Sequence, residues 1–206
     1  MSQTVEKEQG IDTRTRILRS AEKLFAERGY AATSVHDIAE AAGANKALLY
    51  YYFRDKRGLY ESLIEDSHAE VRRMIDAALS APGSYTDRLR GFIDRFVNLL
   101  WDRSDRLRIF HRCVTDGEQE KTGLLEKHEE DLDKLETFLA EAQTAGEFCA
   151  VDPAMAARSL IGLTCSFALW QIFHKKQFSR HQVIAHVTDI LLHGLRVEPE
   201  ARGACT

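Results

Sequence analysis

Residues 34–53 read SVHDIAEAAGANKALLYYYF, and this stretch predicts two short helices joined by a tight turn. Ser34 and Asp37 have the spacing of a capping box, which marks the start of the first helix. Gly43 ends that helix and supplies the turn, and Asn45 is a suitable N-cap for the second helix. Two short helices around a glycine-bearing turn are the arrangement of a helix-turn-helix.

The apolar residues of this stretch have helical spacing, which gives each short helix an inward face. In the second helix, Leu49 and Phe53 lie four residues apart and therefore share a face. Three consecutive tyrosines at 50–52 surround the rest of that helix, and consecutive helical residues cannot all face a core. Exposed phenolic hydroxyls are good donors to phosphate oxygens. The inward residues of the first helix are Val35, Ile38, Ala39 and Ala42.

Two lysines at predicted helix starts point to the same function. Lys46 lies in the first turn of the second short helix, and Lys56 lies in the first turn of the helix that follows. A cation at a helix N-terminus opposes the helix dipole at a cost of about 0.3–1 kcal/mol. The placement becomes favourable if phosphates bind at both helix ends. The alternative is that both lysines are solvated surface residues, but their combination with the helix-turn-helix spacing favours a DNA contact.

Helical spacing continues on both sides of the helix-turn-helix. Residues 17–25 predict a supporting helix, with Asp12 as its N-cap and Gly29 immediately after its end. Asp55 can cap a long helix that stops before Pro82. These helices buttress the two short ones, so the N-terminal part of the chain predicts a compact helical domain.

The C-terminal part of the chain keeps the same period. The polar stretch TDGEQEKTG at 115–123 predicts a loop, and the acidic run at 129–131 is interpreted as a solvated helix face. Asp152 and Pro153 open a helix over 154–176 that is apolar nearly all round, which indicates burial on more than one side. The sequence therefore predicts an all-α fold of about nine helices, without strands or repeats.

The composition excludes several classes of protein. Of the 206 residues, 44% are hydrophobic and 29% are charged, which is typical of a globular chain and not of a disordered one. The four cysteines are dispersed without a CxxC pair, so a reducing cytosol is favoured over a disulfide or zinc framework. The longest charge-free stretch, 159–173, is shorter than the roughly 20 residues of a membrane helix. With no apolar signal segment at the N-terminus, we expect a cytoplasmic protein without a membrane partner.

Charge is distributed unevenly along the chain. Residues 1–60 hold ten Lys and Arg against eight Asp and Glu, whereas the remaining residues hold 18 against 24. The net charge is −4, so a mildly basic segment precedes an acidic body. This asymmetry hints at a polyanionic partner for the N-terminal segment alone.

Residues 13–64 resemble the DNA-binding domain of the tetracycline-repressor-like (TetR/AcrR) transcriptional regulators. The matching pieces are ILRSAEKLFAERGYAATSVHDIAEAAG, then NKALLYYYF, then DKRGLYESLIE. The resemblance implies an all-helical homodimer, most often a repressor, that binds double-stranded DNA at a palindromic operator. It also implies an acidic C-terminal domain that binds a small-molecule effector. No enzymatic activity, catalytic residue, metal or cofactor is expected.

The resemblance implies the following domain organisation. A three-helix DNA-binding domain is expected over residues 11–71, with its helix-turn-helix at 34–53. A C-terminal bundle for ligand binding and dimerisation is expected over 72–198, and residues 1–10 and 199–206 are expected to be flexible tails.

The resemblance also assigns DNA contacts by position. Thr33 or Ser34 resembles the phosphate contact at the start of the first short helix. The backbone contacts of the recognition helix and of the next helix correspond to Lys46, Tyr50, Tyr52 and Lys56. The residues at the positions that meet base edges are Ala47, Leu48 and Tyr51. Leu48 departs from the usual Thr or Ser, so it loses a hydroxyl but could touch a thymine methyl.

The last two long helices indicate how a dimer forms. The helix over 154–176 is too apolar to have only one covered side in a monomer of this size. The final helix has an apolar stripe of its own, so two copies of the pair can form a four-helix contact.

Aromatic residues in the C-terminal part fit either a core or a ligand pocket. A core role is the more frequent one for any single aromatic residue. As a pocket, they would line an apolar cavity for a small, mainly apolar effector, whose polar group meets His111 or Gln171. The residues expected to contact such an effector are Phe96, Trp101, Phe110, His111, Phe167, Trp170 and Gln171.

Two alternatives stand beside this interpretation. His186, Asp189 and His193 share one face of the final helix, where a polar surface is favoured over a metal site. The second functional hypothesis is a helical carrier or enzyme for an apolar metabolite, which keeps a vestigial helix-turn-helix for packing. Lys46 and Lys56 argue against it, because packing does not require lysines at exposed helix starts.

Overall fold

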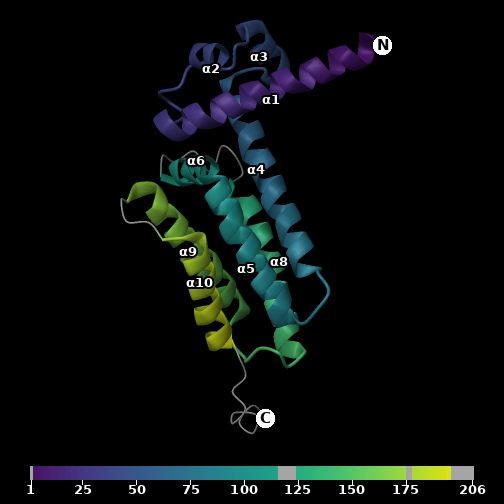
Figure 1. Cartoon of the computed structure of the whole chain (residues 1–206), viewed down its shortest axis with the longest axis vertical. Coiled ribbons are helices and arrows are strands. Elements are labelled where there is room, and N and C mark those ends of the chain that lie inside the picture. The colour runs from purple at the N-terminus through teal and green to yellow at the C-terminus, as the bar shows by residue number, and fades with distance from the viewer. Residues whose placement is uncertain (1, 116–123, 175–177, 196–206) are drawn as a thin grey trace. The chain divides into compact units, whose positions relative to one another are not determined.

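The structure, a computed structural model, describes residues 2–115, 124–174 and 178–195. Within these ranges the secondary-structure elements are nine helices, which confirms the predicted all-α fold (Figure 1). The tail predicted at 199–206 and most of the predicted loop at 115–123 lie outside the described residues. The helices are α1 (Ser2–Arg28), α2 (Val35–Ala41), α3 (Lys46–Phe53), α4 (Lys56–Leu79), α5 (Tyr85–Asp102), α6 (Ser104–Thr115), α8 (Leu124–Thr144), α9 (Pro153–Phe173) and α10 (Arg180–Leu195).

The first helix is longer than its apolar pattern predicts. α1 begins at Ser2, so the predicted N-cap at Asp12 is wrong, and residues 2–10 are helical where a flexible tail was expected. Gly10 lowers helix stability by roughly 1 kcal/mol without ending the helix. The end of α1 is the predicted one, because Gly29 takes a positive φ of 84° and donates its N–H to the Phe25 carbonyl at 2.9 Å.

The chain forms two compact units, of which the first comprises residues 2–68, 105–115 and 124 in the described ranges. Its core gathers buried residues of α1 to α4 together with Ile109 and Cys113 of α6. An ion pair between Arg106 and Glu22, at 3.3 Å, also joins α6 to α1. The structure thus groups α6 with the helix-turn-helix, whereas the family resemblance implied a C-terminal domain over residues 72–198 that includes it.

The capping residues of the helix-turn-helix act as predicted. The Ser34 hydroxyl accepts the Asp37 N–H at 3.1 Å, and the Asp37 carboxylate accepts the Ser34 N–H at 3.0 Å. Hydrogen bonds from the Ser34 backbone and hydroxyl lower the pKa of Asp37. Gly43 has a positive φ of 58°, and the Asn45 side chain accepts the Leu48 N–H at 2.8 Å. Both short helices therefore begin at a hydrogen-bonded cap.

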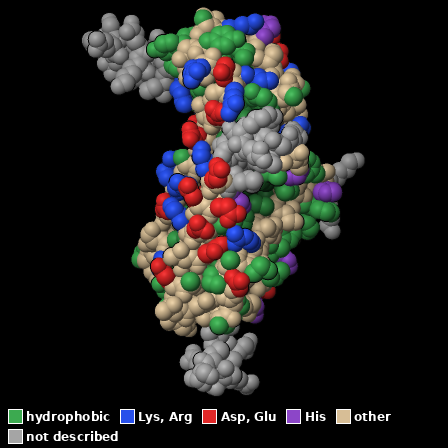
Figure 2. Space-filling model, turned by 180° about the vertical axis from the view of Figure 1, so that it is seen from behind, with side chains coloured by type: hydrophobic (Ala, Val, Ile, Leu, Met, Phe, Trp, Pro, Cys, Tyr) green, Lys and Arg blue, Asp and Glu red, His purple; other side chains and the backbone are tan. Residues whose placement is uncertain are grey.

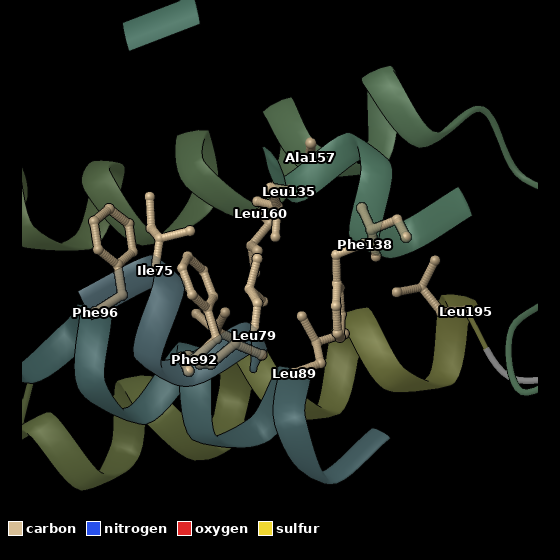
Figure 3. Packing of buried hydrophobic residues seen from close by; sticks show 14 of the residues in the cluster. Ile75, Leu79, Leu89, Phe92, Phe96, Leu135, Phe138, Ala157, Leu160 and Leu195 are labelled. Carbon is tan, nitrogen blue, oxygen red and sulfur yellow. The ribbon is translucent and has the colours of Figure 1, made fainter. Parts of the chain in front are cut away.

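The second unit is a helical bundle formed by α5, α8, α9, α10 and the part of α4 after residue 68. Figure 3 shows apolar side chains from these helices meeting in one core. Asp152 caps α9 as predicted, since its carboxylate accepts the Ala154 N–H at 2.9 Å. The fully buried residues of this core include Phe92, Leu89, Ile93, Leu135 and Val97.

The acidic run at 129–131 is not a simple solvated face. Asp131 is only 6% exposed, and its carboxylate lies 3.2 Å from the Arg72 guanidinium of α4. Glu130 lies 2.5 Å from the same guanidinium, and these bonds raise the pKa of Arg72. Figure 2 shows acidic and basic side chains interspersed over one face of the molecule. The solvated-face interpretation is therefore wrong for Asp131, which links α8 to α4.

α9 covers the core with only one of its sides. Leu160, Thr164 and Ala168 are buried, whereas Trp170 and Phe173 are exposed. By length and composition alone, α9 is the one helix in the described residues that could cross a membrane, although its longest charge-free stretch is short. Core helices pass the same test, and α9 packs Leu160, Thr164 and Ala168 into the second unit.

We predict that Ser34→Ala lowers the free energy of unfolding by about 1 kcal/mol, because it removes the cap of α2. Urea unfolding of the full chain measures this loss. The difference should shrink as pH falls through the lowered pKa of Asp37, since protonation of that carboxylate weakens the bond it accepts from the Ser34 hydroxyl, which the alanine variant lacks.

The matched control is Thr137→Ala, which removes an exposed hydroxyl from the interior of α8. It should change stability by less than about 0.5 kcal/mol. Equal losses in the two variants would contradict the capping role of Ser34.

Candidate nucleic-acid interface

The eight residues of α3 divide into an anchored side and an outward side. Leu49 and Phe53 are buried in the core of the first unit, as the helical spacing predicts. Tyr51 is 80% exposed and Tyr50 is 50% exposed, which confirms that the consecutive tyrosines are not all core. Tyr52 is half-buried, with its ring 5.1 Å from that of Tyr51. α3 is therefore held by one side and presents the other to solvent.

The outward side of α3 carries most of the side chains predicted to contact DNA phosphates and bases. Lys46, Ala47 and Leu48 are exposed in its first turn, and Tyr50 and Tyr51 follow one turn later. An ammonium and two phenolic hydroxyls supply donors for phosphate oxygens, while the aliphatic side chains can contact base edges. An exposed helix of this size fits the major groove of B-DNA. The predicted contacts Lys46, Ala47, Leu48, Tyr50 and Tyr51 are thus exposed, whereas Tyr52 is half-buried and packs against the core.

Thr33 and Ser34, predicted as alternative phosphate contacts, have different environments. Thr33 is 1% exposed, and its hydroxyl donates to the carbonyl of Gly29 at 2.8 Å and to that of Leu24 at 3.3 Å. Its side chain therefore holds the turn after α1. Ser34 is exposed at the start of α2. Of the two, Ser34 is the residue that a phosphate can approach.

Lys56 is not the exposed lysine that the sequence predicts. Its side chain is half-buried, and its ammonium donates to the carbonyls of Tyr30 at 2.8 Å and Thr33 at 2.9 Å. The same nitrogen lies 4.2 Å from the centre of the Tyr30 ring. Sequence reasoning missed these bonds because the partners lie 26 and 23 residues away in the chain. The expectation that packing does not use Lys56 is wrong.

The junction between α3 and α4 is a tight turn that the sequence did not reveal. Arg54 takes a φ of 64° and a ψ of −52°, and Asp55 donates its N–H to the Phe53 carbonyl at 2.8 Å. This is a γ-turn with positive φ, a strained conformation. The Asp55 carboxylate then accepts the Gly58 N–H at 2.7 Å and caps α4, as predicted. A Cβ at Gly58 would collide with the Phe53 carbonyl oxygen.

The residues predicted to bind an effector are divided between the two compact units. Phe110 belongs to the first unit, where it lines a small hollow with Leu63, Ile64 and Ile109. His111 is half-buried in the same helix, α6. The five other predicted residues belong to the second unit.

Within the second unit, those five residues have separate partners. Phe96 is buried against Phe92, and Trp101 is half-buried beside the same core. Phe167 packs edge-on against Phe178, whose backbone is bonded through its N–H and carbonyl to the Gln171 amide. Trp170 is 42% exposed and stacks on His174. Gln171 therefore links α9 to the segment before α10, and Phe96 is a core residue.

The polar face of α10 has local partners. His193 lies 3.0 Å from the Asp189 carboxylate, and the His186 ring packs edge-on against Phe167. Among the described residues, no three His, Cys, Asp or Glu side chains converge on a common metal position. Burial raises the pKa of the Cys165 thiol to about 12, so this cysteine stays neutral.

The fold and the outward side of α3 define a helix-turn-helix protein, and comparison with known proteins identifies its family. Residues 17–63 match the family model of bacterial regulatory proteins of the tetR family, and residues 82–195 match the tetracyclin repressor-like C-terminal domain. The second match alone covers more than half of the chain. The chain belongs to the tetR family, and it is a DNA-binding transcriptional regulator.

Individual relatives match along most of their length. The HTH-type transcriptional regulator YdgC of Bacillus subtilis is 26% identical over 92% of this chain and 95% of its own. The HTH-type transcriptional repressor SCO4008 of Streptomyces coelicolor is 28% identical over 78% of each chain. A solved TetR/AcrR-family regulator of Thermobifida fusca is 27% identical, with a TM-score of 0.65, and the match covers 90% of this chain and 100% of that one.

We predict that Gly58→Ala destabilises the first unit by about 1–3 kcal/mol, because the new Cβ displaces the Phe53 carbonyl and with it the end of α3. Thermal unfolding and DNA affinity should both report the change.

Gly91→Ala is the matched control, since an added Cβ in α5 meets nothing within 4 Å. This variant should be stabilised by up to about 1 kcal/mol through the gain in helix propensity. If both glycine variants gained stability, the close approach at Gly58 would be refuted.

Proposed function

We propose that this regulator is a homodimeric repressor that binds a palindromic operator through α3 and is released by a small, mainly apolar effector. The observation that carries the DNA-binding part is the outward side of α3, where a lysine, two tyrosines and two aliphatic residues are exposed together. The match to a repressor, SCO4008, supports repression over activation. The relatives are regulators, so the alternative of a carrier or enzyme has no support.

The proposed contacts divide by chemistry. Lys46 and Tyr50 bind phosphates and fix the register of α3, and Ser34 adds a phosphate contact at the start of α2. Ala47, Leu48 and Tyr51 meet base edges in the major groove, where an aliphatic side chain distinguishes thymine by its methyl group. Specificity and affinity therefore depend on different residues of the same helix.

We predict that Lys46→Ala weakens binding to all DNA sequences similarly and lowers the slope of log K against log salt by about one. Leu48→Ala and Tyr51→Ala should instead change which bases are selected, at a cost of roughly 1–3 kcal/mol against the preferred site. Selection of sites from random duplexes, followed by salt titration, measures both effects.

Arg90→Ala is the charge-matched control, because Arg90 is exposed on α5 in the second unit. It should leave slope and preference unchanged. A change of base preference in Lys46→Ala with an unchanged slope would show that the phosphate assignment is mistaken.

The exposed side of α9 and the adjoining face of α10 support a homodimer. Met155, Trp170 and Phe173 of α9 and Ile190 of α10 are large apolar side chains exposed to solvent. Figure 2 shows hydrophobic side chains and histidines along the right-hand edge of the molecule. Two copies of this helix pair form a four-helix contact, in which the same surface of each chain is used. Two recognition helices then meet half-sites one DNA turn apart, or a multiple of it.

We predict that Ile190→Glu converts the dimer to a monomer at micromolar concentration, because a carboxylate would be buried without a partner. Sedimentation equilibrium gives the mass directly. Val114→Glu makes the same change at an exposed apolar position of α6 and should remain dimeric. A wild-type chain that sediments as a stable monomer would exclude the dimer.

The effector and the location in the cell remain part of this proposal. Of the predicted ligand residues in the second unit, Trp101 and Phe167 are the half-buried aromatic ones, and they supply an apolar surface for such a molecule. A regulator of this family acts on DNA in the cytoplasm, which agrees with four dispersed cysteines.

A further inference from the structure

The Lys56 ammonium already has partners within the first unit. Two of its three donors reach the carbonyl oxygens of Tyr30 and Thr33, at 2.8 and 2.9 Å. The face of the Tyr30 ring lies 4.2 Å from the same nitrogen. Bonds from an ammonium to a carbonyl are stronger than those between neutral groups, and a cation is attracted to the face of an aromatic ring. A DNA phosphate would have to displace these partners to bind Lys56.

The surroundings of Lys56 also explain why a cation is tolerated at the start of α4. α1 ends at Arg28, and Tyr30 and Thr33 belong to the turn that follows. A cation in the first turn of a helix is opposed by the helix dipole. The charge-assisted bonds to the Tyr30 and Thr33 carbonyls offset this cost for Lys56 in the first turn of α4. No phosphate is needed to explain it.

The two carbonyls and Lys56 lie on opposite sides of the helix-turn-helix in the chain. Thr33 immediately precedes Ser34, which caps α2, and its own hydroxyl fixes the turn through the Gly29 carbonyl. Lys56 begins α4 directly after the γ-turn that ends α3. The Lys56 side chain thus links the residues directly before the helix-turn-helix to the residue that begins α4 directly after it. We call this set of bonds from Lys56 to the Tyr30 and Thr33 carbonyls the joint.

Aromatic rings pack beside this link between the turn after α1 and the start of α4. The Tyr30 ring lies 4.9 Å from that of Tyr60, one turn along α4 from Lys56. The Tyr60 ring in turn meets Phe25 of α1 edge-on at 5.2 Å. Lys56 therefore closes a contact between α1 and α4 that ring packing already orients.

We propose that Lys56 is a positioning residue, which sets the orientation of α2 and α3 by tying the turn after α1 to the start of α4, and that it is not a phosphate ligand. The inference rests on the proposed DNA-binding function. It differs from a general structural role, because loss of the joint should impair DNA binding by chains that remain folded.

The test compares Lys56→Met with Lys46→Met in the full chain. Both substitutions remove one ammonium and keep an unbranched apolar stem, so the change of net charge is equal. DNA affinity is measured against salt concentration, well below the unfolding temperature, on a duplex selected from random sequence by the wild-type chain. Amide hydrogen exchange of residues 30–38 is measured on the same proteins without DNA.

For Lys56→Met we expect about tenfold weaker binding, equivalent to about 1.4 kcal/mol, with an unchanged salt slope and faster exchange at 30–38. For Lys46→Met we expect a slope lower by about one and unchanged exchange. A slope lowered by about one in Lys56→Met would overturn the proposal in favour of a phosphate contact. Unchanged affinity with faster exchange would reduce Lys56 to a purely structural residue.

A measurement on the wild-type chain keeps the proposal testable if Lys56→Met does not fold. The ¹⁵N signal of the Lys56 ammonium should be protected from solvent exchange in the free chain and unaltered when the duplex is added. A signal that becomes protected only with DNA would overturn the proposal. If the wild-type chain selects no duplex, the proposed function fails, whereas exchange at 30–38 still tests the joint itself.

Discussion

Burial of Leu49 and Phe53 is the constraint on which the recognition surface depends. α3 has eight residues, and an isolated helix of that length is not stable in water. Each of the two side chains gains roughly 1.5–3 kcal/mol by leaving solvent, and their partners in the core include Ile17 of α1 and Ile38 of α2. The helical conformation of α3 is therefore a property of the packed unit.

The same dependence explains why a turn with positive φ persists at Arg54. A strained residue remains in place only when its surroundings determine its conformation. On one side Phe53 is fixed in the core, and on the other the Asp55 carboxylate caps α4. The close approach of Gly58 to the Phe53 carbonyl shows how little space separates the two helices.

Features that depend on neighbours in sequence could be predicted, and features that depend on distant partners could not. Helical spacing placed Leu49 and Phe53 inward, and cap chemistry located Ser34 and Asn45, because both act within one helical turn. The start of α1 was misplaced, since the helix continues past its apolar stripe to residues without an amphipathic pattern.

The residues of the candidate DNA interface show the same division between local and distant determinants. The exposure of Tyr50 and Tyr51 follows from helix geometry, but the burial of Lys56 depends on carbonyls more than 20 residues away. Asp131 is a similar case, because its position in an acidic run hides a partner on another helix. A charged residue at a helix start or in a charge run has no local signal that distinguishes solvent from a backbone partner.

The separation of anchored and outward residues in α3 has a consequence for how such a protein diversifies. Lys46, Ala47, Tyr50 and Tyr51 are exposed and take no part in the core, so exchanging them costs little folding free energy. Duplicated copies of the gene can therefore drift toward new target sites while the scaffold stays intact. For the same reason, grafting another reading surface onto α3 is a route to regulators with chosen targets, provided that Leu49 and Phe53 are retained.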